Sequence, residues 1–426
     1  MARLAIFTTL LALSTSAPTP STSDEHLSKI FKVPLPTKPA PPKQCPISFA
    51  KNFIPQGYPF ETHTVTTADG YILTLFRFQK TFTTIKNSGL PVVFVQHGMD
   101  NGAVSWLMNG EQGLVFLLAN AGYDVWLGNN RGSKYSRKHV SLSINSKAFW
   151  TFSFDEMAKF DLPANLGYVR KTTGGRKITY IGHSQGTTQM FAALSDSKIR
   201  PNVAPYINRF YALAPIVYLN HNTTPIPNYA AYLTKLVKDL ATAFDVNYLN
   251  LGTCVFDQAS VDYWNKYCPS HVIKCYGPSF KLLDNDPYVD NWARTGYHNL
   301  ATPSGVSANS FLHYAQILER QNTDQSYFAK YDYGNAVQNF EHYGQTTAPS
   351  YDLGLVEEQV HLWVGSGDHL ATEVEAELIE QAMVNAQTQT HIIPHWGHTT
   401  FHFGKESATV YKQLVDEIRE LNAMII

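Results

Sequence analysis

The pattern Gly182-His183-Ser184-Gln185-Gly186 places a serine between two glycines at the spacing G-x-S-x-G. Ile178–Ile181, just before it, is β-branched and aromatic, which is typical of a buried strand, and Thr187–Leu194 after it is typical of a helix. A strand, a tight turn and a helix in this order indicate a nucleophile elbow, which exposes a serine hydroxyl at the edge of a sheet. We therefore expect Ser184 to be a nucleophile, with the backbone N–H of Gln185 facing the oxyanion that forms.

A serine nucleophile needs a base, and the base needs a carboxylate that holds its tautomer. The apolar stretch Gln359–Gly365 reads as a strand and leads into Ser366-Gly367-Asp368, a turn that presents a carboxylate. Thr390–Ile393 reads as the last strand, and the turn after it contains His398. Because the carboxyl ends of parallel strands meet at one edge of a sheet, Asp368 and His398 are predicted to lie beside Ser184. An ordinary turn aspartate or a helix cap is the alternative interpretation of Asp368.

Three other histidines compete with His398 for the role of base. His391 lies within the predicted strand and His402 is a turn beyond it, so His395 is the main rival. The spacing His395-x2-His398-x3-His402 also matches a zinc pattern. These residues fall in a loop at a strand end and no cysteine or carboxylate cluster joins them, so the sequence predicts no metal site.

A second oxyanion donor is expected from the loop after Pro91–Gln96, another apolar strand. His97-Gly98 follows this strand, and the glycine lets the backbone turn tightly so that the N–H of Met99 points inward. A simple strand-end turn would need a glycine at the same place, so both interpretations stay open.

The elements that would position these residues alternate along the chain. Thr62–Thr67 and Tyr71–Phe78 flank an Asp-Gly turn, which predicts a β-hairpin. Strands and helices then alternate, which predicts a mostly parallel α/β sheet flanked by helices on both faces. The alternation stops between 216 and about 350, a tyrosine-rich stretch that we expect to be a loop-rich insertion covering the site. The predicted organisation is a core formed by 45–215 and 351–426, with a cap at 216–350.

The first residues predict entry into the secretory pathway. Met1–Ser16 has one basic residue, an apolar run and then small residues, which is typical of a signal peptide and too short to span a membrane. Residues 17–44 form a leader rich in Pro, Ser and Thr. No other stretch resembles a transmembrane helix, and a formal net charge of −1 gives no reason to expect a nucleic acid partner. The sequence does not indicate the oligomeric state.

The chain resembles the acid lipases, a family of α/β hydrolases that includes lysosomal acid lipase and the gastric and lingual lipases. The matching strings run from about Tyr58 to Gly404 and are ADGYILTLFRF, VQHGM, AGYDVWLGNNRGSKYSRKH, FWTFSFDEMAKFDLPA, ITYIGHSQGTTQMF, GSGDHLA and HWGHTTFHFG. The resemblance implies an α/β-hydrolase fold with an inserted cap or lid. It also implies that Ser184 is the nucleophile, Asp368 the acid and His398 the base, that Met99 and Gln185 supply the oxyanion hole, and that no cofactor is needed.

The chain departs from the family pattern at several positions. The family usually has an acidic residue and Asp-Phe around the histidine, where this chain has Gly397 and Thr399-Thr400 beside His398. The chain has four cysteines, and those of the cap resemble the family's cluster with different spacing. On that resemblance we expect a Cys254–Cys268 disulfide with Cys275 free, whereas Cys45 has no family counterpart. Asn222-Thr223-Thr224 is an N-glycosylation sequon on a predicted loop.

The expected function is hydrolysis of neutral lipid esters, triacylglycerols or steryl esters, at a lipid–water interface. The expected location is extracellular or lysosomal. A soluble esterase, acyltransferase or peptidase would share the same triad and differ in the cap. A non-catalytic lipid-binding protein of the same fold is disfavoured, because such a protein would be expected to lose a triad residue, and all three candidates are present.

Overall fold

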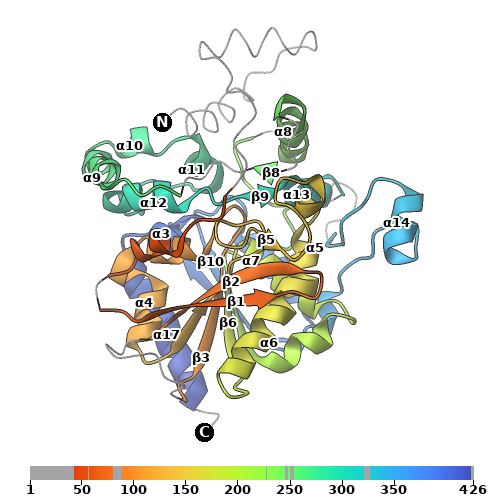
Figure 1. Cartoon of the computed structure of the whole chain (residues 1–426), viewed down its shortest axis with the longest axis horizontal. Helices are drawn as coiled ribbons and strands as arrows, with labels where there is room; N and C mark the ends of the chain where they lie inside the picture. The colour runs from red at the N-terminus through yellow and green to blue at the C-terminus, as the bar shows by residue number, and fades with distance from the viewer. Residues whose placement is uncertain are drawn as a thin grey trace.

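The structure is a computed structural model that describes residues 43–423 apart from 56, 80–88, 227, 245–247, 250–253 and 321–326. The predicted signal peptide, 1–16, and nearly all of the predicted leader lie outside the described residues. The centre of the molecule is a nine-stranded sheet in the order β1-β2-β4-β3-β6-β7-β10-β11, with β5 paired to β2 (Figure 1). Its strands are β1 Phe60–Thr66, β2 Tyr71–Phe78, β3 Val92–Gln96, β4 Asp124–Leu127, β5 Lys138–His139, β6 Ile178–His183, β7 Ile207–Leu213, β10 Gln359–Gly365 and β11 Gln387–Ile393.

The sheet is parallel from β4 to β11 and antiparallel at its beginning. β1 and β2 form the predicted hairpin, and β2 also runs antiparallel to β4. The pairs β3–β4, β3–β6, β6–β7, β7–β10 and β10–β11 are all parallel, so their carboxyl ends meet at one edge. β3, β4 and β6 are buried along their whole length, as expected for apolar strands covered on both faces. The predicted α/β class is therefore confirmed.

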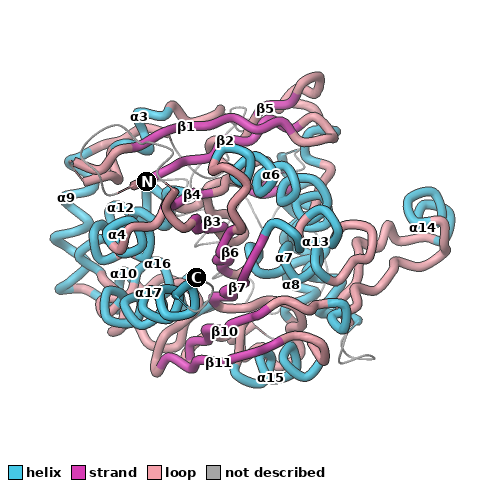
Figure 2. The backbone as a smooth tube through the Cα atoms, turned by 90° about the horizontal axis from the view of Figure 1, so that it is seen from below, coloured by secondary structure: helices cyan, strands magenta, loops and turns pink. Residues whose placement is uncertain are grey.

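Helices cover both faces of this sheet (Figure 2). α4 (Leu114–Asn120) and the terminal α17 (Ser407–Ala423) pack together on one face, and the other carries α6 (Leu162–Thr172), α7 (Gln185–Leu194) and α15 (Glu373–Ala382). Shorter helices are α3 (Ile47–Lys51), α5 (Phe154–Glu156) and α16 (Thr400–Phe403). A π-helical turn, Met157–Asp161, connects α5 to α6.

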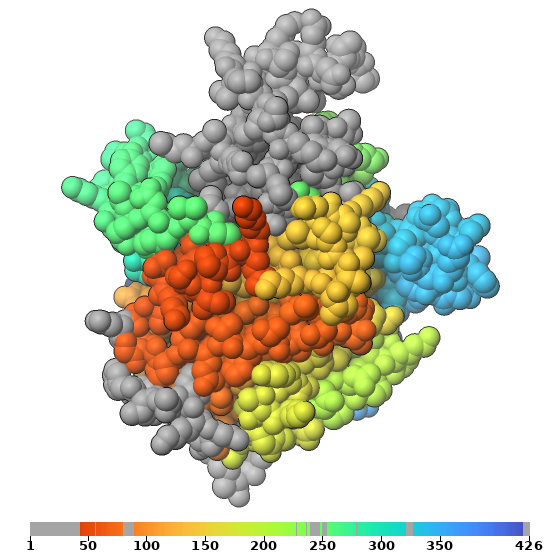
Figure 3. Space-filling model, in the orientation of Figure 1, coloured from red at the N-terminus to blue at the C-terminus, as the bar shows by residue number. Residues whose placement is uncertain are grey.

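The segment between β7 and β10 leaves the sheet and lies mostly above its carboxyl edge (Figure 1). It contains α8 (Tyr229–Phe244), α9 (Gln258–Tyr267), α10 (Val272–Cys275), α11 (Pro278–Leu283), α12 (Thr295–Ala301), α13 (Ala308–Arg320), α14 (Ala336–Tyr343) and the small strands β8 (Tyr248–Leu249) and β9 (Val306–Ser307). α14 projects from the side of the molecule (Figures 1 and 3). This segment is much more helical than the expected loop-rich insertion. Most of its helices have ten residues or fewer, which is too short to show a clear periodic pattern in the sequence.

The expected disulfide Cys254–Cys268, with Cys275 free, is wrong. Cys45 pairs with Cys254, and Cys268 pairs with Cys275, with Cα–Cα distances of 5.1 and 5.7 Å. Cys268 and Cys275 are separated by seven residues across a short helical turn, which brings them within bonding range of each other. The N–H of Cys45 donates to the Lys134 carbonyl, so this residue is fixed on the core where the segment at Cys254 passes.

None of the helices that the structure describes has both the length and the apolar character that crossing a lipid bilayer requires.

Candidate active site

Ser184 occupies the sharp turn between β6 and α7 with φ 53° and ψ −122°, a left-handed conformation that is strained for a serine. Steric crowding requires glycine at positions 182 and 186 of this turn. A Cβ on Gly182 would lie 2.6 Å from the Gly186 carbonyl oxygen, and a Cβ on Gly186 would lie 2.6 Å from the Gln96 carbonyl oxygen. The turn therefore packs directly against β3, and Ser184 is half-buried.

His398 lies within hydrogen-bond distance of both Ser184 and Asp368. The Ser184 Oγ is 2.8 Å from His398 Nε2, and His398 Nδ1 is 2.8 Å from Asp368 Oδ2. Ser184, His398 and Asp368 follow β6, β11 and β10 respectively, at the carboxyl edge of the sheet. This arrangement can pass a proton from the serine hydroxyl to the imidazole while the carboxylate holds the other ring nitrogen protonated.

Asp368 is fixed by the start of the next segment. Its Oδ1 accepts hydrogen bonds from the backbone N–H of Leu370 at 2.8 Å and of Ala371 at 2.9 Å, so Oδ2 is left for His398. Burial disfavours the charged form of His398, but the Asp368 carboxylate outweighs this and raises the pKa of the imidazole above its ordinary value. An imidazolium at His398 would thus be stabilised by the neighbouring Asp368 carboxylate.

The loop after β3 comes close to the serine at Gly98. A Cβ at this position would lie 2.9 Å from Ser184 Cβ and 3.1 Å from His183 Nδ1, so only glycine permits this approach. Met99 follows directly, and Gln185 is the first residue of α7. No described residue accepts a hydrogen bond from the backbone N–H of either Met99 or Gln185. Both donors are therefore available to a substrate oxygen.

Two buried carboxyl groups of the segment above the sheet bind the turn that carries His398. Asp284 Oδ1 accepts from the Thr399 N–H at 2.9 Å and its Oδ2 accepts from the Thr399 hydroxyl. Asp290 Oδ1 accepts from the Thr400 hydroxyl at 2.9 Å. Burial raises the pKa of Asp284 to about 7 and that of Asp290 well above its ordinary value. Sequence reasoning missed both residues, because nothing local marks an aspartate that acts more than a hundred positions away.

The other histidines are placed outside the triad. The side chain of His395 is exposed, and the backbone N–H of this residue donates to Ser366 Oγ at 2.8 Å. His402 is buried, and its Nε2 lies 3.1 Å from Nδ1 of His183, whose Nε2 lies 2.9 Å from the carbonyl oxygen of His398. Burial lowers the pKa of both His402 and His183, so this pair stays neutral and supports the His398 backbone. The zinc-like spacing does not bring His395, His398 and His402 to a common point.

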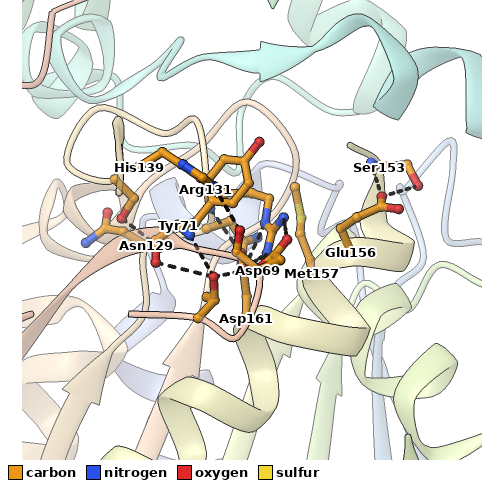
Figure 4. Close-up of polar contacts among 12 residues, drawn as sticks. Asp69, Tyr71, Asn129, Arg131, His139, Ser153, Glu156, Met157 and Asp161 are labelled. Atoms are coloured by element: carbon orange, nitrogen blue, oxygen red, sulfur yellow. Dashed lines mark hydrogen bonds and ion pairs between the residues drawn. The ribbon is translucent and has the colours of Figure 1, made fainter. Parts of the chain in front are cut away.

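Arg131 is a buried arginine whose side chain makes several polar contacts (Figure 4). Arg131 follows β4, and its guanidinium binds Asp161 at 2.7 and 2.8 Å and Asp69 at 2.7 and 3.0 Å, while it lies 4.0 Å from the ring centre of Tyr71. Asp161 ends the π-helical turn that begins at Met157. The Met157 Sδ lies 3.4 Å from Nε2 of Gln185, so the contacts of Arg131 are linked through this turn to the residue that follows Ser184.

Asn222 of the sequon lies in the turn region after β7 and is half-buried. Its Nδ2 donates to the Leu219 carbonyl at 2.7 Å, and its Oδ1 accepts from the Thr224 hydroxyl at 2.8 Å. A glycan on Nδ2 would replace the first of these contacts.

Comparison with known proteins identifies the family to which the chain belongs. The family described as "alpha/beta hydrolase fold" matches residues 91–405, and a "Partial alpha/beta-hydrolase lipase region" matches residues 49–110. The chain is 35% identical to human "Lipase member K" over 84% of this chain and 87% of the relative. It is 34% identical to rat "Gastric triacylglycerol lipase" over 85% and 89%, and 33% identical to human "Lysosomal acid lipase/cholesteryl ester hydrolase" over 85% and 88%. The chain therefore belongs to the acid lipase family of α/β hydrolases.

Proposed function

We propose that this chain is a lipase that hydrolyses carboxylic esters of neutral lipids, triacylglycerols or steryl esters, through an acyl-enzyme on Ser184. The observation that carries the proposal is the unbroken line of contacts from Ser184 Oγ through both nitrogens of His398 to Asp368. The names of two relatives, a gastric triacylglycerol lipase and a cholesteryl ester hydrolase, support neutral lipid esters as the substrate class.

In the first half of the reaction, Ser184 Oγ attacks the ester carbonyl carbon while His398 Nε2 takes the hydroxyl proton. The carbonyl π electrons move to the oxygen, and the N–H groups of Met99 and Gln185 are the proposed donors to that oxyanion. The intermediate then collapses, the bond to the alkoxy oxygen breaks, and His398 gives its proton to the leaving alcohol. In the second half, His398 Nε2 deprotonates a water that attacks the acyl carbon, and Ser184 leaves with the proton.

The segment 216–350 is proposed to act as a cap that holds the acyl chain over Ser184. Its position above the carboxyl edge of the sheet supports this role (Figure 1). Tyr314 of α13 contributes directly, because its hydroxyl donates to Thr188 in the helix after the nucleophile at 3.0 Å. A cap that excludes water would also strengthen the contacts to the oxyanion. Part of it is proposed to open at a lipid surface.

The proposed location is an oxidising compartment reached by secretion, either outside the cell or lysosomal. Two disulfides support it, since such bonds persist in oxidising environments. Asn222 is the proposed glycosylation site within the same pathway.

The proposal is tested with purified protein on emulsified triolein, cholesteryl oleate and a short soluble ester from pH 4 to 8. Ser184→Ala should abolish turnover of every substrate and prevent labelling by a fluorophosphonate, with no loss of thermal stability. Ser195→Ala removes a buried hydroxyl at the other end of α7 and serves as the matched control, with activity retained.

Turnover of the soluble ester alone, with no rate increase on emulsions, would replace the lipase by a soluble esterase. Residual turnover in Ser184→Ala, or labelling of a different residue, would refute the assignment of the nucleophile.

A further inference from the structure

Three ligand-type side chains converge on the face of the sheet covered by α17, away from the triad. His361 lies on β10, His391 on β11 and Glu417 on α17. His361 Nδ1 is 2.5 Å from Glu417 Oε1, and His391 Nε2 is 3.1 Å from Glu417 Oε2. One ligand atom from each residue lies within 4.8 Å of the other two.

The surroundings hold both imidazole rings in place. His361 is 1% exposed and stacks on Tyr211, with ring centres 4.8 Å apart. His391 stacks on Trp363 of the neighbouring strand at 4.4 Å. The positions of the ring nitrogens are thus fixed by packing before any ligand is bound, which lowers the cost of gathering them around one.

A carboxylate that bridges two histidines by hydrogen bonds is the simplest alternative. The contact between His361 and Glu417 is an ion pair, however, and both ring nitrogens of His361 are buried without a hydrogen-bond partner among the described residues. Glu417 Oε1 and His391 Nε2 also lack one there. Buried polar atoms that face each other unpaired are costly, and a cation that accepts their lone pairs would remove that cost.

The distances suit a small divalent ion. Three atoms within 4.8 Å of one another always share a point within about 2.8 Å of each, and side-chain movements below about 1 Å shorten this to the 2.0–2.2 Å of zinc with histidine and carboxylate. The side chains of His391 and Glu417 are 26% and 18% exposed, so the cluster lies close to the protein surface although its ligand atoms are buried.

We propose that His361, His391 and Glu417 bind one Zn²⁺-class divalent cation, which ties α17 to the last two strands of the sheet. Two imidazoles and one carboxylate are a ligand set that zinc prefers. The site is separate from the chemistry of the serine, since His361 lies four residues before the end of β10 and Asp368 lies beyond that end. The ion would therefore stabilise the fold without entering the hydrolytic reaction.

The test uses the full-length protein after dialysis against EDTA and then against metal-free buffer. Titration with Zn²⁺ in a calorimeter should show one equivalent bound, and Co²⁺ should give the visible absorption of a nitrogen- and oxygen-ligated ion. The melting temperature should rise with Zn²⁺ concentration. His391→Ala should weaken binding at least about 100-fold and abolish the rise in melting temperature. His342→Ala, which removes an exposed histidine on α14, should change neither.

Glu417→Gln is the second variant, because it keeps the size of the side chain and the fold while removing the charge. Loss of stoichiometric Zn²⁺ binding in this variant, with an unchanged circular dichroism spectrum, supports the site even if His391→Ala does not fold. Absence of saturable binding to the wild-type protein, or equal affinity in the wild type and Glu417→Gln, would overturn the proposal.

Discussion

Replacing Gly98 with alanine tests the proposed oxyanion loop. The new Cβ would lie 2.9 Å from Ser184 Cβ, whereas carbon atoms in contact prefer about 3.5–4.0 Å, so the loop must retreat by about 0.6–1 Å. A displacement of this size moves the N–H of Met99 out of hydrogen-bond range of the oxyanion. Loss of one such donor lowers kcat by roughly 10²–10³-fold, equivalent to about 3–4 kcal/mol of transition-state stabilisation.

The assay is steady-state hydrolysis of a short soluble ester, which avoids effects of the lipid surface. We expect KM to stay within about threefold and kcat to fall by roughly 100-fold or more, because the donor acts mainly on the transition state. Gly98 does not have a positive φ, so alanine does not strain the backbone conformation, and the steric clash should lower stability by about 1–3 kcal/mol without unfolding the protein. The control is Gly167→Ala on α6, where a Cβ would meet only Tyr206 at 3.7 Å. A kcat for Gly98→Ala within threefold of the wild type would show that this loop does not hold the oxyanion.

Three further predictions concern His398, Arg131 and Asp284. His398→Ala should lower kcat by about 10³-fold or more and His395→Ala should leave it nearly unchanged, and the opposite ranking in the same assay would move the base. Arg131→Gln leaves the Asp161 carboxylate buried without its cation, so the free energy of unfolding, measured by chemical denaturation, should fall by about 3–5 kcal/mol. A fall below about 1 kcal/mol would contradict this stabilising role of Arg131. Asp284, whose pKa is about 7, carries a negative charge near and above neutral pH that raises the pKa of His398, so Asp284→Asn should move the acid limb of the kcat/KM profile slightly to lower pH; a limb that moves upward would refute this coupling.

Much of the sheet and of the site could be predicted from sequence because the signals are local. A glycine-flanked serine between a buried strand and a helix, and polar residues just after two further strands, are each visible within about ten residues. The parallel topology then requires these strand ends to meet. For this reason Ser184, Asp368 and His398 could be singled out, and they do lie within hydrogen-bond distance in the structure.

The remaining features depend on contacts between distant parts of the chain. Cys45 and Cys254 are 209 residues apart, and no spacing rule connects them. Asp284 reaches Thr399 from a segment that shows no periodic pattern and whose path over the sheet is fixed only by packing. The cluster of His361, His391 and Glu417 also depends on contacts between distant segments. Its three residues lie on three elements, and in the sequence each looks like an ordinary polar position.

The bond between Cys45 and Cys254 closes residues 45–254, about half of the chain, into a covalent ring that includes Ser184. A ring of this length removes conformational freedom from the unfolded chain equivalent to about 5 kcal/mol. It also changes how the molecule responds to proteases, since a single cut anywhere within the ring opens it but leaves both pieces joined through sulfur. Such a nicked molecule would migrate as one species on a non-reducing gel and separate into fragments only after reduction. Damage to the surface loops of the ring would therefore not release the nucleophile from the rest of its site.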